Sequence, residues 1–172
     1  MGDRYIVFAN NSQGIIKENY NISRFKDKKK IDIIAGEFII LHDSDNVVIN
    51  TLLGSCVAMC IYDVITGYYG MNHYIIPVGG DFRHGLFSVD NMITEFIKLG
   101  SEISNLECKI YGGASMNNLK LYNTSVGDLN ADFAHEYFTK KDIKIKQFIV
   151  KSKYGMIVSL KPYFLTSYKE LT

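Results

Sequence analysis

The sequence predicts an α+β fold, a single domain in which two main α-helices pack on a mixed or mainly antiparallel β-sheet. Short runs rich in β-branched and aromatic residues recur between turn-forming clusters, as strands do. Two segments instead repeat their apolar residues at helical spacing. The strand-like runs come in groups rather than alternating with helices, which favours α+β over a parallel α/β sheet. With 172 residues, 47% of them hydrophobic, the chain can form one full core.

Residues 1–30 differ from the rest of the chain. They are predicted to form an N-terminal arm or extension, a candidate mobile segment, ahead of a domain at residues 31–172. Residues 10–14 form a polar cluster typical of a turn, and residues 24–30 form a basic run. Nothing organises this run into a groove-sized surface, so we interpret it as a solvated segment rather than a nucleic-acid or lipid site.

Apolar and β-branched runs after residue 30 predict the strands. They cover residues 31–41 with a break at 35–36, then 47–53, the two arms of a hairpin between 56 and 73, 106–111, 143–150 and 156–160. A polar cluster at 42–46 predicts a turn. Pro162 is expected to end the last strand and the sheet, because proline has no N–H to donate to a strand ladder.

Two helices are expected between these strands. The first has an apolar stripe at Val89, Met92, Ile93, Phe96 and Leu99. Ser88 is the predicted N-cap of this helix, and Gly100 is predicted to end it. The second helix is predicted from about residue 128 to residue 140.

Composition excludes several classes of function. The formal net charge is +1, from 19 basic and 18 acidic side chains, so no overall field favours a nucleic acid. Three cysteines without paired spacing do not make a disulfide framework, and we expect a reducing, cytoplasmic location. No stretch approaches the roughly 20 apolar residues of a membrane-spanning helix, and the first residues lack signal-peptide order, so no direct membrane insertion is expected.

The stretch 51–77, TLLGSCVAMCIYDVITGYYGMNHYIIP, carries the residues best suited to chemistry. Cys56 follows Gly54 and Ser55, where the backbone can turn sharply and direct neighbouring N–H groups at one point, as an oxyanion hole requires. His73 lies on the other arm of the predicted hairpin. Because a nearby imidazole can take the proton of a thiol, Cys56 and His73 form a candidate nucleophile and base.

The register of this hairpin decides whether the two groups meet. A four-residue loop at 63–66, closed by a Tyr62–Gly67 pair, would set Cys56 directly opposite His73, with Cβ atoms about 5 Å apart. A slip of one residue would move one of them to the other face. The competing interpretation places Cys56 on a core strand face. That face would also hold Ala58, Cys60 and Tyr62. The residue types leave both interpretations open.

The other cysteines are expected to be buried strand residues. A zinc site built from Cys56, Cys60, Cys108 and His73 is disfavoured, because two cysteines four positions apart on one strand do not wrap around a metal. The sequence contains no Walker loop, Rossmann glycine signature, serine-hydrolase elbow or zincin helix motif. We therefore expect neither a metal nor a cofactor.

The stretch around Cys56 resembles the signature of the CheD chemoreceptor glutamine deamidases of bacterial chemotaxis. That signature has Gly-Ser-Cys-Val, an Asp-containing turn and Gly-Met-Asn-His before a proline, all present within residues 51–77. Residues 82–85 stand at the family's Arg-Tyr-Gly, and residues 106–114 resemble its Leu-Glu-Ala-Lys-Val-Phe-Gly-Gly-Ala. The resemblance extends over roughly residues 33–150 and predicts a CheD-like deamidase domain at 31–172.

The resemblance implies a protein-glutamine glutaminase that converts glutamine side chains of methyl-accepting chemotaxis receptors to glutamate. Cys56 would attack the carboxamide, His73 would act as general base and Thr51 would complete the site. Ammonia would leave, and water would hydrolyse a thioester. The same chemistry would serve a glutamate methyl ester.

The matching motifs also supply supporting residues. These are Gly54 and Ser55 for the oxyanion and the turn, and Asn72, Arg83, Gly112 and Gly113 on the substrate side. The chain departs from the family pattern at Leu129, where an arginine is lost, and at residues 151–155. Family members also bind a CheC-type phosphatase of the response regulator. The alternative hypothesis is therefore a non-catalytic or weakly catalytic module that regulates such a phosphatase.

Overall fold

Thirteen strands and two α-helices are found in the described residues of the computed structural model, which are 5–19, 28–115, 120–121 and 123–172. The strands are β1 (Tyr5–Asn10), β2 (Gly14–Asn19), β3 (Lys30–Asp32), β4 (Glu37–His42), β5 (Val48–Leu53), β6 (Val57–Asp63), β7 (Tyr68–His73), β8 (Leu106–Gly112), β9 (Lys120–Leu121), β10 (Thr124–Ser125), β11 (Lys144–Val150), β12 (Met156–Lys161) and β13 (Leu165–Glu170). The helices are α1 (Gly85–Lys98) and α2 (Val126–Lys140). Two helices with these strands confirm the α+β class.

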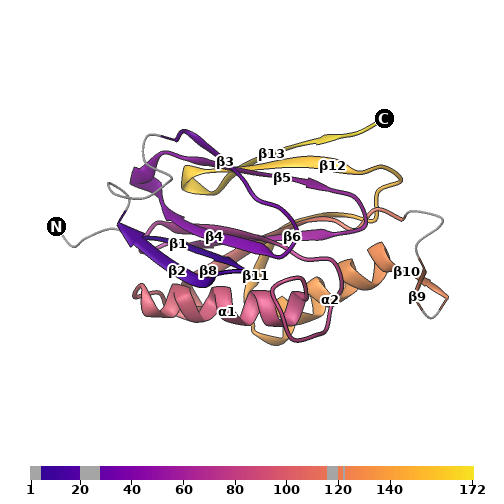
Figure 1. Cartoon of the computed structure of the whole chain (residues 1–172), viewed down its shortest axis with the longest axis horizontal. Helices are drawn as coiled ribbons and strands as arrows, with labels where there is room; N and C mark the ends of the chain where they lie inside the picture. Colours follow the sequence, from indigo (N-terminus) through magenta and orange to yellow (C-terminus); the bar gives the residue numbers. More distant parts are fainter. Residues whose placement is uncertain (1–4, 20–27, 116–119, 122) are drawn as a thin grey trace.

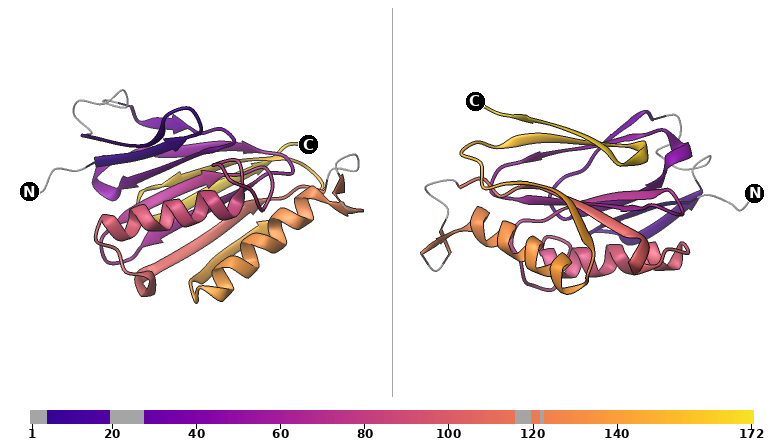
Figure 2. Two further views of the ribbon diagram at one scale, coloured as in Figure 1. Left: turned by 60° about the horizontal axis from the view of Figure 1, so that its bottom comes forward. Right: turned by 180° about the vertical axis from the view of Figure 1, so that it is seen from behind.

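The elements form three layers (Figure 1). A seven-stranded sheet in the order β11-β8-β6-β7-β4-β1-β2 lies in the middle, and a four-stranded sheet in the order β13-β12-β5-β3 covers one of its faces. Helices α1 and α2 lie on the opposite face, as both views in Figure 2 show. In these two sheets only β8–β11 and β3–β5 pair in parallel, so the pairing is mainly antiparallel, as predicted.

The division of the strands between two sheets follows from their burial. Along β12, buried residues alternate with more exposed ones, so this strand covers a core with one face only. In β6 nearly every residue is buried, because this strand lies between the helices and the second sheet. One core therefore lies between the helices and the large sheet, with Phe38, Met59, Met92, Phe96 and Phe138 among its members. A second core lies between the sheets, with Ile39, Leu53, Cys60, Met71 and Tyr111 among its members.

Helix α1 begins three residues before the predicted N-cap, so that prediction is wrong. The N–H groups of Gly85 and Leu86 donate to the carbonyl oxygens of Ile76 and Pro77, at 2.9 Å each, so the preceding loop satisfies the first turn. Ser88 is instead buried inside the helix. The predicted C-terminus is confirmed, because the helix ends at Lys98 and is followed by Gly100 with φ +98°.

Residues 5–19, which the sequence places in an N-terminal arm, form a hairpin at the edge of the large sheet. Strand β1 pairs with β4, and β2 forms the edge. The polar cluster at 10–14 is the turn of this hairpin, where Asn10 Oδ1 accepts the N–H of Gln13 at 2.8 Å. Lys17 of β2 forms an ion pair of 2.5 Å with the buried Glu95 of α1. The basic run at 24–30 lies mostly outside the described residues.

The chain does not leave the sheet at Pro162 as predicted. Pro162 does end β12, but a turn with positive φ at Tyr163 and Phe164 brings the chain back as β13, which pairs antiparallel with β12. Lys109 Nζ donates to the Phe164 carbonyl at 2.6 Å and holds this turn against the large sheet.

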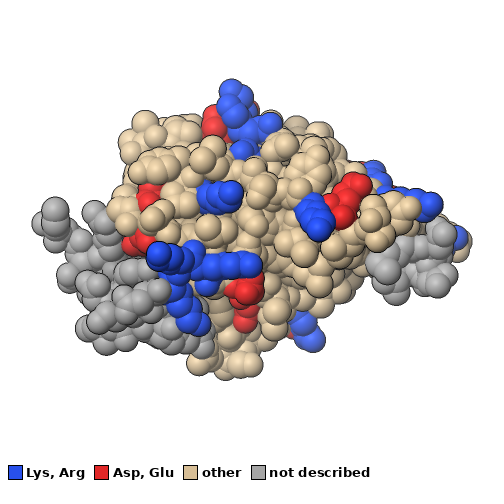
Figure 3. Space-filling view, turned by 90° about the horizontal axis from the view of Figure 1, so that it is seen from above, with Lys and Arg blue, Asp and Glu red and all other residues tan. Residues whose placement is uncertain are grey.

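The outer face of the four-stranded sheet carries scattered basic and acidic groups on a mostly uncharged surface (Figure 3). Exposed apolar side chains there include Leu52, Ile157 and Leu165. Neither helix in the described ranges has the length and apolar character needed to span a membrane.

Candidate active site

The hairpin of β6 and β7 has its loop one residue later than predicted. The loop is 64–67, and Tyr62 pairs with Tyr69 instead of Gly67. Asp63 fixes this turn, because its Oδ1 accepts two loop N–H groups at 2.8 and 3.0 Å. Gly67 follows with φ +77°, a conformation that glycine adopts without strain. The predicted register is therefore wrong by two positions.

A shift of two positions keeps each side chain on its expected face. Val57 bridges to Tyr74, so Ile75 lies opposite Cys56, and His73 is the diagonal neighbour of Cys56. Diagonal neighbours on one face remain within reach of long side chains. The error in register therefore leaves Cys56 and His73 on the same side of the sheet.

That side is the gap between the two sheets. Cys56 packs against the core between the sheets. His73 reaches across the gap to Thr51 of β5 in the four-stranded sheet. Thr51 and His73 are only 3% and 6% exposed, whereas Cys56 is half-buried. Of these three residues, Cys56 is the most exposed to solvent.

The hydrogen bonds of Thr51 determine the tautomer of His73. Thr51 Oγ1 lies 2.9 Å from the carbonyl oxygen of Ile33 and 2.8 Å from His73 Nδ1. A carbonyl cannot donate, so the single hydroxyl hydrogen goes to Ile33, and Thr51 accepts from Nδ1–H. His73 Nε2 then has a free lone pair, and within the described residues it is buried without a hydrogen-bond partner. This is the tautomer that a general base needs.

Both reactive groups are neutral at rest near neutral pH. Burial lowers the pKa of His73 to about 4, so its imidazole carries no charge. Burial also raises the pKa of the Cys56 thiol, and a hydrogen bond from the Cys56 backbone N–H offsets part of this rise. The sequence led us to expect an imidazole that holds a thiolate. The structure instead has a neutral thiol and a neutral imidazole on the same side of the sheet, with no hydrogen bond between them among the described residues.

Gly112 and Gly113 support the turn that carries Cys56. The Gly113 N–H donates to the Cys56 carbonyl at 2.8 Å, and the Ala114 N–H donates to the Gly54 carbonyl at 3.0 Å. A Cβ on Gly112, whose φ is +108°, would lie 2.3 Å from the Cys56 carbonyl oxygen. The glycine pair therefore acts through close backbone packing.

Asn72 points away from Cys56, toward the helix layer. It is fully buried, its Oδ1 accepts the Met59 N–H at 2.9 Å, and its Nδ2 donates to Ser88 Oγ at 3.1 Å. The carboxamide thus takes a strand N–H and ties β7 to α1. The structure does not bring Asn72 to the thiol side.

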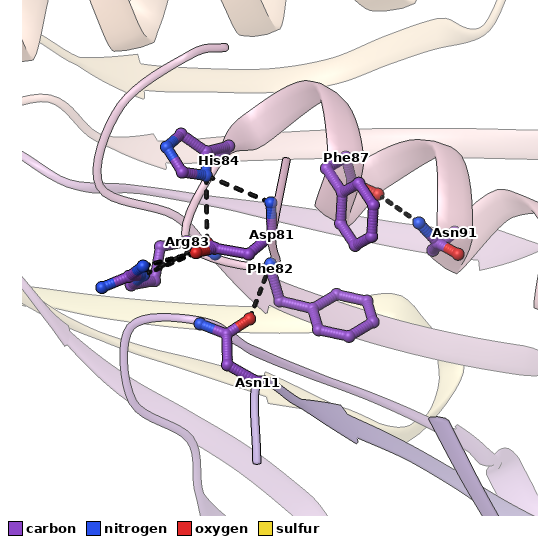
Figure 4. Close-up of polar contacts among 7 residues, drawn as sticks. All are labelled: Asn11, Asp81, Phe82, Arg83, His84, Phe87 and Asn91. Carbon is purple, nitrogen blue, oxygen red and sulfur yellow. Dashed lines mark hydrogen bonds and ion pairs between the residues drawn. The ribbon is translucent and has the colours of Figure 1, made fainter. Parts of the chain in front are cut away.

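Arg83 lies in the loop before α1, beside a cavity of about 300 Å³. The cavity is lined by Ile75, Ile76, Arg83 and His84. Figure 4 shows Arg83 and His84 both bonded to Asp81, whose carboxylate accepts from Arg83 Nε at 3.1 Å and lies 3.0 Å from His84 Nδ1. The Arg83 guanidinium holds the pKa of Asp81 well below its usual range. Cys56 is not among the residues that line this cavity, although Ile75, which lies opposite Cys56 on the neighbouring segment, is.

The two other thiols do not join the site. Cys60 lies in the core between the sheets and Cys108 in the core under the helices, both fully buried. Burial raises the pKa of Cys60 to about 12 and also raises that of Cys108. Across the described ranges, no cluster of three or more His, Cys, Asp or Glu side chains could hold a metal ion.

Asn130 of α2 touches this site and is absent from the predicted site residues. It is fully buried, and its Nδ2 donates to the carbonyl oxygens of Ser55 at 2.9 Å and Ile75 at 2.7 Å. The sequence could have indicated this residue, because Asn130 lies one turn before Ala134 on the face of α2 that packs inward. A polar residue on a buried helix face needs partners, and here the partners are backbone carbonyls of the site.

The comparisons with known proteins agree with the sequence motifs. A family model described as CheD chemotactic sensory transduction matches residues 77–165, a segment that begins after His73. Proteins named "Probable chemoreceptor glutamine deamidase CheD" are similar to this chain. That of Cupriavidus metallidurans is 31% identical over 79% of this chain and 65% of its own length. That of Burkholderia vietnamiensis is 32% identical over 76% of this chain and 55% of its own length. That of Agrobacterium fabrum is 37% identical over 68% of this chain and 66% of its own length.

The chain therefore spans between 55% and 66% of the length of these three relatives. Among solved structures, a hypothetical protein YfiH of Bacillus licheniformis overlaps 74% of this chain and 58% of its own, with 13% identity and a TM-score of 0.42. That likeness is too distant to support a conclusion.

Proposed function

Because this chain belongs to the CheD family, we propose that it is a cysteine-dependent deamidase that converts glutamine side chains of chemotaxis receptors to glutamate. The observation that carries the proposal is the Thr51–His73 hydrogen bond, which leaves Nε2 of a neutral imidazole free on the side of the sheet that also holds the half-buried Cys56. A nucleophilic thiol needs such a base when its own pKa is raised. The names of the similar proteins support glutamine of a chemoreceptor as the substrate.

The first half of the proposed reaction forms a thioester and releases ammonia. The Cys56 sulfur attacks the carboxamide carbon of the glutamine while its proton passes to His73 Nε2. The carbonyl oxygen becomes an oxyanion, and its proposed donor is the Cys56 backbone N–H, which lies close to the sulfur. The C–N bond then breaks as His73 returns the proton to the departing nitrogen. The low pKa of His73 makes its protonated form a strong acid for this step.

The second half restores the enzyme. Water attacks the thioester carbon as His73 Nε2 takes one of its protons, and the C–S bond breaks with return of that proton to sulfur. The product is a glutamate side chain, which ionises at neutral pH. The same two steps with a glutamate methyl ester would release methanol, because only the leaving group differs.

The proposed substrate segment is a cytoplasmic helix of a methyl-accepting chemotaxis receptor. Deamidation replaces a neutral side chain with an anionic one, and the added charge changes the electrostatics of such a helix. A CheC-type phosphatase is a second proposed partner, carried by the family resemblance.

The proposal is tested by incubating the protein with a receptor cytoplasmic fragment and measuring ammonia together with the amide-to-acid mass change at each glutamine. We expect release with wild type, loss in Cys56→Ala and His73→Gln, and retention in Cys108→Ala, which removes a buried thiol remote from the gap. A folded wild type that releases no ammonia from any receptor fragment would refute deamidation. Binding to a CheC-type phosphatase would then be the better account.

A further inference from the structure

Asn130 holds together the two segments on which the reactive groups stand. Its Nδ2 donates to the Ser55 carbonyl, directly before Cys56, and to the Ile75 carbonyl, two residues after His73. Since both partners are carbonyl oxygens, only the amide nitrogen can face them, and both of its hydrogens are used. One side chain of α2 therefore fixes the nucleophile turn relative to the strand of the base.

The bond to Ser55 also sets the direction of a neighbouring N–H. The carbonyl of Ser55 and the N–H of Cys56 belong to one planar trans peptide, so they point in opposite directions. With the carbonyl held by the buried Asn130, the Cys56 N–H is turned away from α2. In the described part of the chain this N–H donates to no backbone carbonyl. It is close enough to the Cys56 sulfur to lower the pKa of the thiol, against the larger rise that burial causes.

We propose that Asn130 is a positioning residue that fixes the Ser55–Cys56 peptide plane and so directs the Cys56 N–H at the reacting sulfur and the oxyanion. It touches neither the substrate nor the sulfur and acts through the backbone. The inference rests on the proposed function for its kinetic readout only. Its chemical readout, the reactivity of Cys56, needs no substrate.

Other contacts of Asn130 support a role beyond filling space. Its Oδ1 is buried without a partner among the described residues, so the side chain carries a desolvated acceptor to keep its two donors in place. Tyr74 donates its hydroxyl to the Asn130 carbonyl at 2.5 Å, which ties this turn of α2 to the strand segment after His73. An apolar residue would pack here without an unpaired oxygen but could not hold the two carbonyls.

The test compares Asn130→Ala and Asn130→Asp with wild type. Iodoacetamide labelling of Cys56 is followed against pH by mass spectrometry, and kcat and KM for ammonia release are measured. We expect a higher apparent pKa of Cys56 in both variants and a larger rise in Asn130→Asp, whose carboxylate faces two carbonyl oxygens. We expect kcat to fall about 10- to 100-fold, below the full loss of one oxyanion donor, with KM changed about twofold or less.

Ala134→Gly is the matched control, because it weakens the same buried face of α2 one turn away and leaves both carbonyl bonds intact. It should lower the unfolding midpoint and leave the labelling profile of Cys56 unchanged. If Asn130→Ala does not fold, Asn130→Asp, which keeps the shape of the side chain, decides alone. Folded Asn130 variants with a wild-type Cys56 profile and wild-type kcat would overturn the proposal. A wild type without ammonia release would refute the deamidase and leave the labelling result valid.

Discussion

Replacing Thr51 by valine removes one hydroxyl that makes two buried hydrogen bonds. In the structure this hydroxyl donates to the Ile33 carbonyl at 2.9 Å and accepts from His73 Nδ1 at 2.8 Å. Valine keeps the branched shape, so little volume is lost, but the carbonyl and the Nδ1–H both lose their partner. Thr51→Val therefore isolates the hydrogen bonds from the packing.

The expected effects differ for stability and for rate. Leaving one buried polar group unpaired costs about 1–3 kcal/mol. Two groups lose their partner here, so we expect the free energy of unfolding to fall by that amount or more. A hydrogen bond of about 1.4 kcal/mol favours the productive His73 tautomer roughly tenfold. Poorer orientation adds to this loss, and the full effect of a general base, about 10²–10⁴, is the upper limit. We expect kcat for ammonia release to fall about 10- to 100-fold.

Thr51→Ser is the control, because it keeps the hydroxyl and removes only a methyl group. Both variants are assayed for ammonia release, for urea unfolding and for the pH dependence of Cys56 labelling. We expect Thr51→Ser to retain most of the wild-type kcat. Equal kcat values for the valine and serine variants would show that the Thr51 hydroxyl does not set the His73 tautomer, and the assignment of Nε2 as the base would lose its support.

Four further predictions follow from the same structure. Burial lowers the pKa of His73 to about 4, while the unfolded side chain titrates near 6.5, so only the unfolded state gains this proton as pH falls from 6.5 to 4. The free energy of unfolding should therefore drop by about 3 kcal/mol over this range, and this drop should be absent in His73→Gln. His73→Ala should slow labelling of Cys56 more at pH 7 than above pH 9, where hydroxide forms a growing share of the thiolate. Gly112→Ala should cost at least about 2 kcal/mol and displace Cys56. Lys17→Met should cost about 1–2 kcal/mol by leaving the buried Glu95 with a single cation.

Each of these predictions has a control or an opposing outcome. For the pH effect, urea unfolding of His73→Gln with the wild-type slope between pH 6.5 and 4 would assign the slope to another group. For labelling, equal slowing at all pH values would indicate altered access to the thiol. Gly100→Ala has a similar φ, +98°, but open space around its Cβ, so it should cost less than Gly112→Ala. Lys140→Met breaks an exposed pair and should be near neutral in thermal melts.

The parts of the site that lie close together in the sequence were predictable. The alternation of β6 and β7 and the glycine in their turn predicted a hairpin with Cys56 and His73 on one face. The loop position was wrong because Asp63 can either begin the turn or end the strand. It ends the strand here, since its carboxylate caps the loop N–H groups. The predicted strand face of Cys56 and His73 is still correct, because side-chain direction repeats every two residues.

The parts that depend on tertiary packing were not predictable. No local pattern says that β5 belongs to a second sheet, yet only that placement brings Thr51 to His73. Asn72 and His73 are adjacent in sequence, and strand alternation sends the first to α1 and the second to the gap. The polar cluster at 10–14 and the basic run at 24–30 indicated an arm, but the apolar run before the cluster forms β1, which pairs with β4 in the large sheet. Asn130 reaches the site only through the packing of α2.

The resting state with a neutral thiol and a neutral base follows from where the site is built. A thiolate and an imidazolium between two sheets would both require desolvation, and their attraction must then offset that cost. A neutral pair avoids this cost, and in the proposed mechanism charge forms only as the substrate carbonyl arrives to accept the electrons. The donors that stabilise this charge must then already be in place, because the sulfur carries no charge beforehand to orient them. This requirement explains why backbone groups around Cys56 are held by buried partners, Gly112 and Gly113 on one side and Asn130 on the other.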